Sequence, residues 1–477
     1  MITALQEQLK KKEKTVSNLV TEYLERIGER DGEIQAFLSV RTNEATQEAR
    51  QKDAGEPKGV LWGIPGAIKD NICIAGEGVT AGSKILEHYV APYDATVIER
   101  LRVAGAIFLG KTNMDEFAMG SSTENSAYQV TKNPHDSNRV AGGTSGGSAA
   151  AVALGMAAFA LGSDTGGSIR QPAAFCGVVG FKPTYGRISR YGLIAAASSL
   201  DQIGTLTSSV RDAAILLSVM AGEDIHDATC APLPNGKPFE ECLEGDLQGI
   251  RIGVPKEYFP EDLDSEMRAI LEEKLEKLKM KGAEIIPVSL PHAKFALPAY
   301  YIIQPAEVSS NLARFDGIRY GIRNQEVKEG SSLSLLLSTY FLSRGKNLGR
   351  EVKRRIMLGT HALSSGYYDA YYQKAQKVRG LLKHDFERAF ENVDVLFSPT
   401  TPDIAFKIGE KEDPLSMYLS DIYTVTANLV GVPAISVPVG TKIVEGKALP
   451  IGAQLIGKWF DEETLLKVAH HLEQINN

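Results

Sequence analysis

Residues 142–172 read GGTSGGSAAAVALGMAAFALGSDTGGSIRQP, in which two glycine- and hydroxyl-rich runs flank a stretch of small and apolar residues. The runs are Gly142–Ser148 and Gly162–Pro172. The stretch from Ala149 to Gly162 predicts a buried helix, because it is shorter than the roughly 20 residues that span a bilayer and its small side chains allow close backbone approach. We therefore expect both runs to meet at one site.

Glycine is concentrated in this part of the chain. Twelve of the 51 residues from Gly142 to Gly192 are glycine, more than twice the frequency of the whole chain, where 45 of 477 residues are glycine. Consecutive N–H groups without side chains form a concavity that binds anions, as the oxyanion of an acyl transfer requires. Linker glycines are the alternative, but the apolar context indicates a buried, ordered segment.

Short apolar runs alternate with helical patterns on both sides of this segment. We expect helices at Thr15–Arg30 and Asp264–Lys281, the second closed by Gly282. The expected strands lie at residues 61–69, 106–109, 177–181, 250–255 and 283–288. This alternation predicts an α/β fold with helices on both faces of its sheet.

The strand and helix rhythm continues into the second half, so we expect that half to extend the same sheet. A single domain over residues 1–477 is therefore predicted, and two domains are the alternative. Within it we expect an N-terminal helical segment over about residues 1–55 and a core at about 60–215. The polar residues from about 223 to 249 form an excursion.

Composition and charge exclude several classes of protein. The hydrophobic fraction of 43% and the charged fraction of 23% exclude disordered, collagen-like and disulfide-scaffold proteins. The chain has 52 basic and 59 acidic residues, and this net charge of −7 argues against a surface built to bind nucleic acid. The four cysteines and eight histidines show no metal-binding spacing. No hydrophobic leader is seen, so reduced thiols and a cytoplasmic location are expected.

The segment Gly105–Thr112 matches the phosphate-binding pattern GxxxxGK[ST] letter for letter. Its four middle residues are Ala, Ile, Phe and Leu, which favour a buried strand. A strand cannot wrap a phosphate, so we do not expect ATP to bind here.

The segment Gly143–Gly147 matches the nucleophile elbow GxSxG, with Ser145 as the candidate nucleophile. An elbow needs a strand before it, and residues 137–141 make a poor strand. An α/β-hydrolase that uses Ser145 with a later Asp and His is the alternative mechanism.

A nucleophilic serine needs a base, and no histidine lies between Gly142 and Gly192, although a distant one could fold in. A lysine made neutral by burial is the other candidate, because desolvation lowers the pKa of lysine. Lys69 qualifies, since the apolar residues 64–68 precede it. A lysine that snorkels to the surface is the alternative.

At these residues the chain resembles the amidase signature family. The resemblance rests on GAIKDN around Lys69 and on the two glycine-rich runs, has matching spacings and covers essentially the whole chain. It implies the amidase signature fold, with a large mixed β-sheet covered by helices on both faces. It also implies a Ser-cisSer-Lys apparatus, in which Ser168 is the acyl-forming nucleophile and Lys69 the base.

In register, the middle residue of this proton relay is Thr144, where the family usually has a serine. Threonine keeps a hydroxyl that can pass a proton, although its methyl group restricts rotation. By the same resemblance, the oxyanion hole consists of the N–H groups of Thr165, Gly166, Gly167 and Ser168. A catalytically inactive scaffold is the alternative that the threonine raises.

Residues 309–320 and 359–368 are similar to the branch of the family that hydrolyses glutamine for a tRNA-dependent amidotransferase. This similarity implies that Arg355 and Asp421 bind the α-carboxylate and α-ammonium groups of glutamine, with Tyr300 as a neighbouring contact. The sequence leaves the choice between Arg354 and Arg355 open. A stand-alone amidase that acts on small amides is the alternative function.

The same resemblance implies partners. In that branch the B and C subunits complete a heterotrimer: the B subunit binds ATP, Mg²⁺ and the charged tRNA and receives the ammonia through a channel, and the small C subunit clasps the other two. The sequence does not distinguish Glu-tRNA(Gln) from Asp-tRNA(Asn) as the acceptor. No cofactor and no metal are expected in this chain itself.

Overall fold

The computed structural model describes residues 1–233, 237–324 and 334–476. Within these residues, eleven strands form one sheet in the order β1-β3-β2-β4-β6-β5-β10-β11-β9-β7-β8. The strands are β1 (Phe37–Val40), β2 (Pro65–Lys69), β3 (Ile107–Thr112), β4 (Phe159–Asp164), β5 (Val179–Lys182), β6 (Gln202–Thr207), β7 (Arg251–Pro255), β8 (Glu284–Val288), β9 (Val395–Pro399), β10 (Ala434–Val444) and β11 (Lys447–Gly457).

The sheet is mixed. Parallel pairing joins β3 to β2 to β4 at one end and β9 to β7 to β8 at the other. The remaining neighbours pair antiparallel, which includes the central strands and the edge strand β1. Because one sheet contains strands from both halves of the chain, the prediction that the second half extends the sheet of the first is confirmed.

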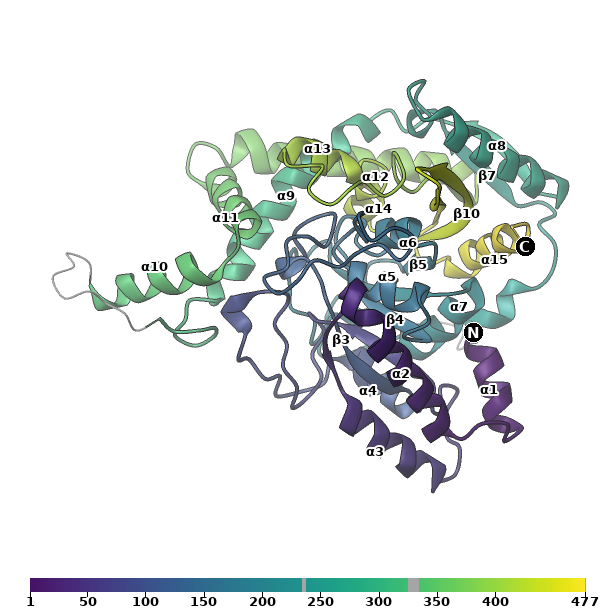
Figure 1. The fold of residues 1–477 in the computed structure, drawn as a ribbon. Coiled ribbons are helices and arrows are strands. Elements are labelled where there is room, and N and C mark those ends of the chain that lie inside the picture. The colour runs from purple at the N-terminus through teal and green to yellow at the C-terminus, as the bar shows by residue number, and fades with distance from the viewer. Residues whose placement is uncertain (234–236, 325–333, 477) are drawn as a thin grey trace.

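Helices surround this sheet (Figure 1). They are α1 (Ile2–Lys10), α2 (Val16–Ile34), α3 (Thr42–Asp53), α4 (Thr96–Val103), α5 (Gly146–Ala153), α6 (Arg170–Cys176), α7 (Val210–Met220), α8 (Ser265–Met280), α9 (Ala296–Asn311), α10 (Leu335–Asn347), α11 (Arg350–Leu363), α12 (Lys374–Asn392), α13 (Pro414–Tyr418), α14 (Val425–Val430) and α15 (Glu462–Gln474). Helices α2, α3 and α4 lie at one end of the molecule, and α9, α11, α12 and α13 lie at the other (Figure 1).

Local signals explain where the predicted helices begin and end. Thr15 accepts a hydrogen bond from the N–H of Asn18 and caps α2, which continues four residues beyond the predicted end. Asp264 caps α8 in the same way, and Gly282 follows that helix with a φ of +101°. The strands predicted at residues 250–255 and 283–288 are confirmed as β7 and β8, which precede and follow α8 in the chain.

Two predicted segments are wrong in part. The helix expected over Ala149–Gly162 ends at Ala153, and the chain turns at Gly155, whose φ is +65°, before it enters β4. The expected N-terminal helical segment also contains β1, which pairs with β3. Burial between two layers, rather than helical periodicity, decides that the last part of this apolar run, residues 159–162, forms a strand.

The polar excursion at about 223–249 contains a short 3-10 helix at Phe239–Leu243. The side chains of Phe239 and Leu243 are buried and belong to the main hydrophobic core. Residues 234–236 of the excursion lie outside the described residues.

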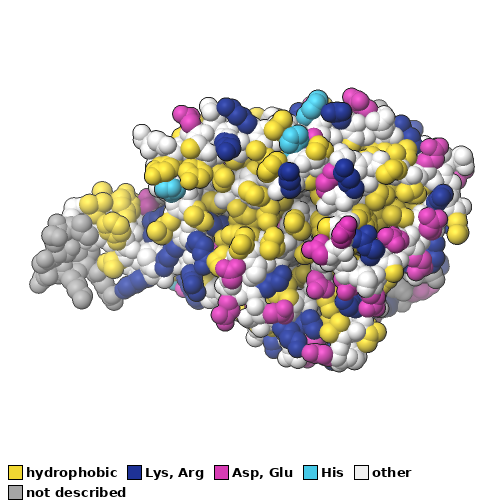
Figure 2. All heavy atoms as spheres, turned by 90° about the horizontal axis from the view of Figure 1, so that it is seen from above, with side chains coloured by type: hydrophobic (Ala, Val, Ile, Leu, Met, Phe, Trp, Pro, Cys, Tyr) yellow, Lys and Arg dark blue, Asp and Glu magenta, His cyan; other side chains and the backbone are white. Residues whose placement is uncertain are grey.

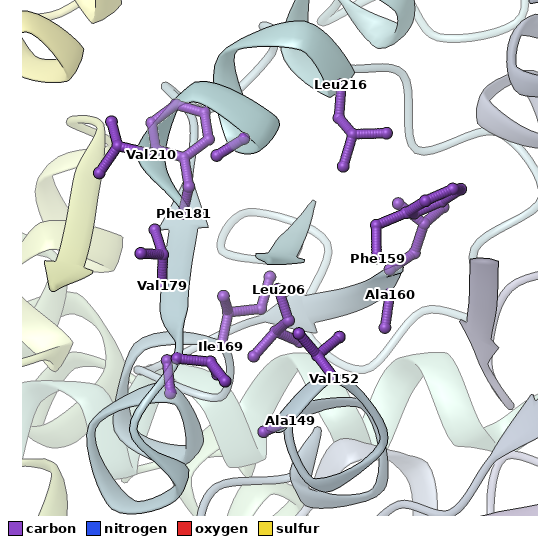
Figure 3. Packing of buried hydrophobic residues seen from close by; sticks show 14 of the residues in the cluster. Ala149, Val152, Phe159, Ala160, Ile169, Val179, Phe181, Leu206, Val210 and Leu216 are labelled. Atoms are coloured by element: carbon purple, nitrogen blue, oxygen red, sulfur yellow. The ribbon is translucent and has the colours of Figure 1, made fainter. Parts of the chain in front are cut away.

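The main core lies on both faces of β4, β5 and β6 (Figure 3). On one face α5 contributes Ala149 and Val152, and on the other α7 contributes Val210 and Leu216, with the strands between them (Figure 3). The predicted arrangement of helices on both faces of the sheet is therefore confirmed.

Helix α10 projects from the body of the molecule (Figure 1). It exposes four large apolar side chains, which form a hydrophobic surface on the projecting part of the molecule (Figure 2): Leu335, Leu336, Leu337 and Phe341. In the part of the chain that the structure describes, no helix is long and apolar enough to cross a membrane.

The core predicts the effect of a substitution at Leu206, a fully buried residue of β6 that lies beside Ile169 and Val152 (Figure 3). We expect Leu206→Ala to lower the free energy of unfolding by about 2–5 kcal/mol, because it removes apolar contacts and leaves a cavity. Val103→Ala is the control, since Val103 is 82% exposed, and it should change the free energy by less than about 0.5 kcal/mol. Equal denaturant midpoints for the two variants would show that Leu206 does not pack as described.

Candidate active site

The predicted catalytic residues meet at one edge of the sheet. Strands β2 and β4 are parallel, with Ile68 opposite Leu161, so their carboxyl ends lie side by side. Lys69 is the last residue of β2, and Ser163 and Asp164 end β4. The two glycine-rich runs lie beside these strands in the chain. The first leads into α5, and the second connects β4 to α6.

The side chain of Lys69 is completely buried and its amine faces hydroxyl groups. Its Nζ atom lies 2.7 Å from Thr144 Oγ1, 2.8 Å from Ser145 Oγ and 2.9 Å from Ser163 Oγ. Burial lowers the pKa of the Lys69 amine to about 7, although the nearby carboxylates of Asp115, Asp164 and Asp201 act in the opposite direction. The amine is therefore available as a neutral base near pH 7, and a surface-directed lysine is excluded.

Thr144 and Ser145 both contact this amine, but their hydrogen bonds differ. Ser145 Oγ donates to the carbonyl oxygen of Ser163 at 3.1 Å, so its proton is already committed. Within the described residues, Lys69 is the one hydrogen-bond partner of the Thr144 hydroxyl. The proton of Thr144 is consequently free to move, which favours Thr144 over Ser145 as the middle group of a proton relay.

The nucleophile elbow around Ser145 is not formed. None of residues 137–141 lies in a strand, and only Arg139 and Val140 form isolated bridges. Ser145 occupies the N-cap position of α5 with a φ of −110°. The described residues also contain no cis peptide bond, so the bond that precedes Thr144 is trans, which differs from the cis bond that the family resemblance implies.

Ser168 lies directly against the first glycine-rich run. An added Cβ at Gly143 would come within 3.2 Å of the Ser168 Cα atom, so the two runs are in contact. In the described part of the chain, the Ser168 hydroxyl makes no hydrogen bond, and the residue is 8% exposed. Its oxygen is thus open to a substrate that enters this turn.

The N–H groups of the expected oxyanion hole are not equivalent. Gly167 donates its N–H to Asp164 Oδ1 at 2.8 Å, so this group is occupied. The N–H groups of Thr165, Gly166 and Ser168 have no acceptor among residues 1–233, 237–324 and 334–476. Those three are free to donate to an oxyanion, whereas Gly167 holds the turn in shape.

The Asp164 carboxylate holds this turn in place. Its carboxylate pairs with the buried guanidinium of Arg170 at 3.0 Å and accepts the N–H of Ile169 at 3.2 Å as well as that of Gly167. Burial alone would raise the pKa of Asp164, but Arg170 holds that pKa at about 2. The carboxylate therefore stays ionised at neutral pH and keeps the peptide groups of the turn oriented.

Tyr300, Arg355 and Asp421 meet beside the same turn. An added Cβ at Gly166 would lie 2.6 Å from the Tyr300 hydroxyl, so the tyrosine ring covers that glycine. Tyr301 connects the two charged groups, since its ring lies 5.2 Å from the Arg355 guanidinium and its hydroxyl donates to Asp421 Oδ2 at 3.0 Å. A fixed cation and a fixed anion therefore flank one aromatic ring.

The structure distinguishes Arg355 from Arg354. Arg355 is buried on α11, where its Nε donates to Glu351 Oε1 at 2.8 Å and one terminal nitrogen donates to Gln304 Oε1 at 3.1 Å. Its other terminal nitrogen makes no hydrogen bond to any described residue and can bind a carboxylate. Arg354 is 29% exposed and forms its ion pair with Glu351 on the helix surface.

Asp421 has the opposite charge for a substrate ammonium group. It accepts hydrogen bonds from Ser121 Oγ at 2.7 Å and from Tyr301, both at Oδ2, which leaves Oδ1 with only a long contact to Gln171. Burial raises the pKa of Asp421 to about 6. The carboxylate is therefore ionised above that pH and able to pair with an ammonium group.

Sequence reasoning missed Ser163, Tyr301 and Glu351. Ser163 lies within the second glycine-rich run, and Tyr301 follows the predicted Tyr300. Only their positions in the sequence pointed to the site. Glu351 stands four residues before Arg355, which is the spacing of a helical ion pair. Within the described ranges, no group of three or more His, Cys, Asp or Glu residues is arranged to hold a metal ion.

A mixed sheet that brings together a buried lysine, two hydroxyl residues and a serine in a glycine-rich turn has the arrangement expected of a serine amide hydrolase. The family model described as Amidase matches residues 18–466, and the chain belongs to that family. This confirms the fold that the sequence resemblance implies.

The named proteins similar to this chain include A subunits of glutamyl-tRNA(Gln) amidotransferase. The chain is 56% identical over 480 residues to the A subunit of glutamyl-tRNA(Gln) amidotransferase of Geobacillus kaustophilus, covering 99% of this chain and 96% of the relative. It is 53% identical to the protein of the same name from Persephonella marina, covering 100% and 97%.

Solved structures show the same fold. The A subunit of glutamyl-tRNA(Gln) amidotransferase from Thermotoga maritima matches with a TM-score of 0.80 and 44% identity, covering 96% of this chain and 91% of that one. The peptide amidase PAM, solved with the inhibitor chymostatin, matches with a TM-score of 0.83 and 30% identity, covering 99% and 97%.

The hydrogen bonds at Lys69 predict different effects for its two hydroxyl neighbours. We expect Thr144→Ala to lower kcat for amide hydrolysis by about 100-fold or more, because it removes the proton relay. Ser145→Ala removes an acceptor for Lys69 and a hydrogen bond to the carbonyl oxygen of Ser163 but leaves the relay intact, so it should cost less. Thr144→Ser should be at least as active as wild type. Steady-state ammonia release measures all three, and a larger loss in Ser145→Ala than in Thr144→Ala would contradict the relay.

The lowered pKa of Lys69 predicts the pH dependence of acylation. Below pH 7 the amine is protonated and cannot accept a proton from Thr144, so the single-turnover rate should rise as the pH increases through about 7 and then level off. Lys69→Arg stays protonated over this range and should be inactive at every pH. A rate that falls as the pH rises through 7 would exclude Lys69 as the base.

Proposed function

We propose that this chain is the glutamine-hydrolysing component of a tRNA-dependent amidotransferase and that it supplies ammonia to a partner protein. The observation that carries the proposal is the placement of Arg355 and Asp421 on either side of Tyr301, next to the Ser168 turn. Free glutamine presents an α-carboxylate and an α-ammonium group, which need a cation and an anion at fixed positions. The relatives named as A subunits of glutamyl-tRNA(Gln) amidotransferase support the amidotransferase part of the proposal.

The first half of the reaction forms an ester. Ser168 Oγ attacks the side-chain amide carbon of glutamine, and its proton passes to Thr144 while the Thr144 proton passes to Lys69 Nζ. The N–H groups of Thr165, Gly166 and Ser168 stabilise the oxyanion, and each such donor contributes about 10²–10³ in rate. The carbon–nitrogen bond then breaks, the proton returns to the leaving nitrogen, and ammonia departs from a glutamyl ester on Ser168.

The second half releases glutamate. A water molecule occupies the position that ammonia has left, and Lys69 accepts its proton through Thr144 as the water oxygen bonds to the ester carbon. The tetrahedral intermediate collapses, Ser168 Oγ takes back a proton, and glutamate leaves. Lys69 is neutral again at the end, so one base serves both half-reactions.

The acceptor chemistry belongs to partners in this proposal. We assign binding of ATP, Mg²⁺ and the charged tRNA to the B subunit, and assembly of a heterotrimer in the cytoplasm to the B and C subunits together. The segment Gly105–Thr112 supports this division, because most of it is strand β3 and the Lys111 side chain is buried, so the segment does not form a phosphate-binding loop. The exposed apolar side chains of α10 also suit a protein partner.

A stand-alone amidase for small amides is the second candidate function. It is supported by the likeness to the peptide amidase, whose fold is shared, and it needs only Lys69, Thr144 and Ser168. The charged groups around Tyr301 favour glutamine instead, because a simple amide has no group for the second terminal nitrogen of Arg355 or for Asp421 Oδ1 to bind.

One experiment separates these functions: ammonia release from glutamine and from acetamide, each with and without the B and C subunits. Ser168→Ala should abolish both activities by at least about 10³-fold. Arg355→Ala should raise the KM for glutamine about 10- to 100-fold, since it removes a charge-assisted hydrogen bond, and should leave acetamide turnover unchanged. Lys353→Ala is the control, because the Lys353 amine bonds the carbonyl oxygen of Gly345 outside the site.

The outcomes are distinct. Better turnover of acetamide than of glutamine, without stimulation by the partners, would favour the stand-alone amidase. Full activity in Ser168→Ala would overturn the assignment of the nucleophile.

A further inference from the structure

The loop from Asp115 to Asn125 is organised around one buried carboxylate. Asp115 is completely buried, and its Oδ2 accepts the N–H groups of Thr123 at 3.0 Å and of Ser122 at 3.4 Å. Its Oδ1 accepts the N–H of Asn125 at 2.7 Å. The carboxylate therefore closes the loop on itself through three peptide groups.

Part of this loop has an unfavourable backbone conformation. Phe117, Ala118 and Thr123 have φ angles of +49°, +58° and +63°, in the left-handed region that residues with a Cβ atom rarely adopt. Such conformations persist only where the surrounding contacts hold them, and they are concentrated at functional sites. Thr123 is held by Asp115, by the contacts of its own hydroxyl, and by the N–H of Thr131, which donates to its carbonyl oxygen at 3.4 Å.

The Thr123 hydroxyl holds the segment that carries Thr144. Its Oγ1 donates to the carbonyl oxygen of Gly143 at 2.9 Å and lies 3.2 Å from that of Gly142. Thr123 Oγ1 also accepts the N–H of Gly146 at 3.0 Å. These contacts lie on both sides of Thr144, so they fix the backbone from which its hydroxyl points to Lys69.

The same loop also reaches the other half of the site. Ser121 Oγ donates to Asp421 Oδ2 at 2.7 Å, and this bond orients the carboxylate beside Tyr301. Ser121 and Thr123 are two residues apart, and the N–H of Thr123 is held by Asp115. One loop thus contacts both the proton relay and the group assigned to the substrate ammonium.

We propose that Asp115–Asn125 is a positioning loop that sets the two halves of the active site separately. Thr123 positions Thr144 for proton transfer, and Ser121 positions Asp421 for substrate binding. Asp115 holds the loop backbone that carries both residues, through the N–H groups of Ser122, Thr123 and Asn125. The Ser121 part rests on the proposed glutaminase function, whereas the Thr123 part applies to any amide that Ser168 attacks.

The two residues should therefore affect different kinetic constants. Thr123→Val should lower kcat about 10- to 100-fold for glutamine and for acetamide alike and leave the KM for glutamine unchanged, because a small misplacement of a catalytic group is costly. Ser121→Ala should raise the KM for glutamine about tenfold at unchanged kcat, and acetamide hydrolysis should not change. Asp115→Asn should produce both effects, because an amide offers fewer acceptor positions than a carboxylate.

The experiment uses the full chain with its partner proteins, and two variants control for folding. Thr123→Ser keeps the hydroxyl and should restore kcat. Thr207→Val removes a comparable buried hydroxyl, which donates to the carbonyl oxygen of Ser209 at the far end of β6, and should leave both kinetic constants unchanged. Thermal unfolding of each variant is measured alongside.

Three results would overturn the proposal: parallel changes of kcat and KM in Thr123→Val and Ser121→Ala, an equal loss in Thr207→Val, or no recovery in Thr123→Ser. Failure of the proposed function has a different signature. In that case wild type hydrolyses acetamide but not glutamine, Ser121→Ala has no effect, and Thr123→Val still lowers kcat for acetamide. A wild-type chain that hydrolyses neither amide contradicts both proposals.

Discussion

The burial of the Lys69 amine at the carboxyl end of β2 is the constraint on which the site depends. Removing an amine from water disfavours its protonated form, and here it lowers the pKa of Lys69 to about 7, so that the neutral amine is available as a base. Three hydroxyl oxygens within 2.9 Å replace the lost water. The Ser145 hydroxyl already donates its proton to a carbonyl oxygen, which favours Thr144 over Ser145 as the group that passes a proton.

Close backbone packing around this amine accounts for the excess of glycine. An added Cβ at Gly143 would lie 2.5 Å from Pro172, one at Gly166 would meet the Tyr300 ring, and one at Gly167 would lie 2.2 Å from Thr424. Side chains at these positions would push the relay, the oxyanion donors and the substrate groups apart. Glycine is thus needed both for its bare N–H groups and for the contact between segments distant in sequence.

The sequence predicted the parts of the fold and site that local patterns determine. Helix α8 and strand β7 have clear periodicity and end signals, and Lys69 stands out as a lysine after an apolar run. Strand β4 was missed because an Ala- and Gly-rich run suits a helix or a buried strand, and only its place in the sheet decides. The role of Tyr301 was not predictable, since it depends on Arg355 and Asp421, which come from distant elements.

The most direct test of this account is to locate the acyl group during glutamine turnover. Wild type is mixed with glutamine, quenched in acid within the first turnover, digested and analysed by mass spectrometry. A glutamyl ester is expected on Ser168 alone, and it should accumulate more slowly below pH 7 as Lys69 becomes protonated. A glutamyl group on Ser145, or release of ammonia with no adduct on Ser168, would contradict it.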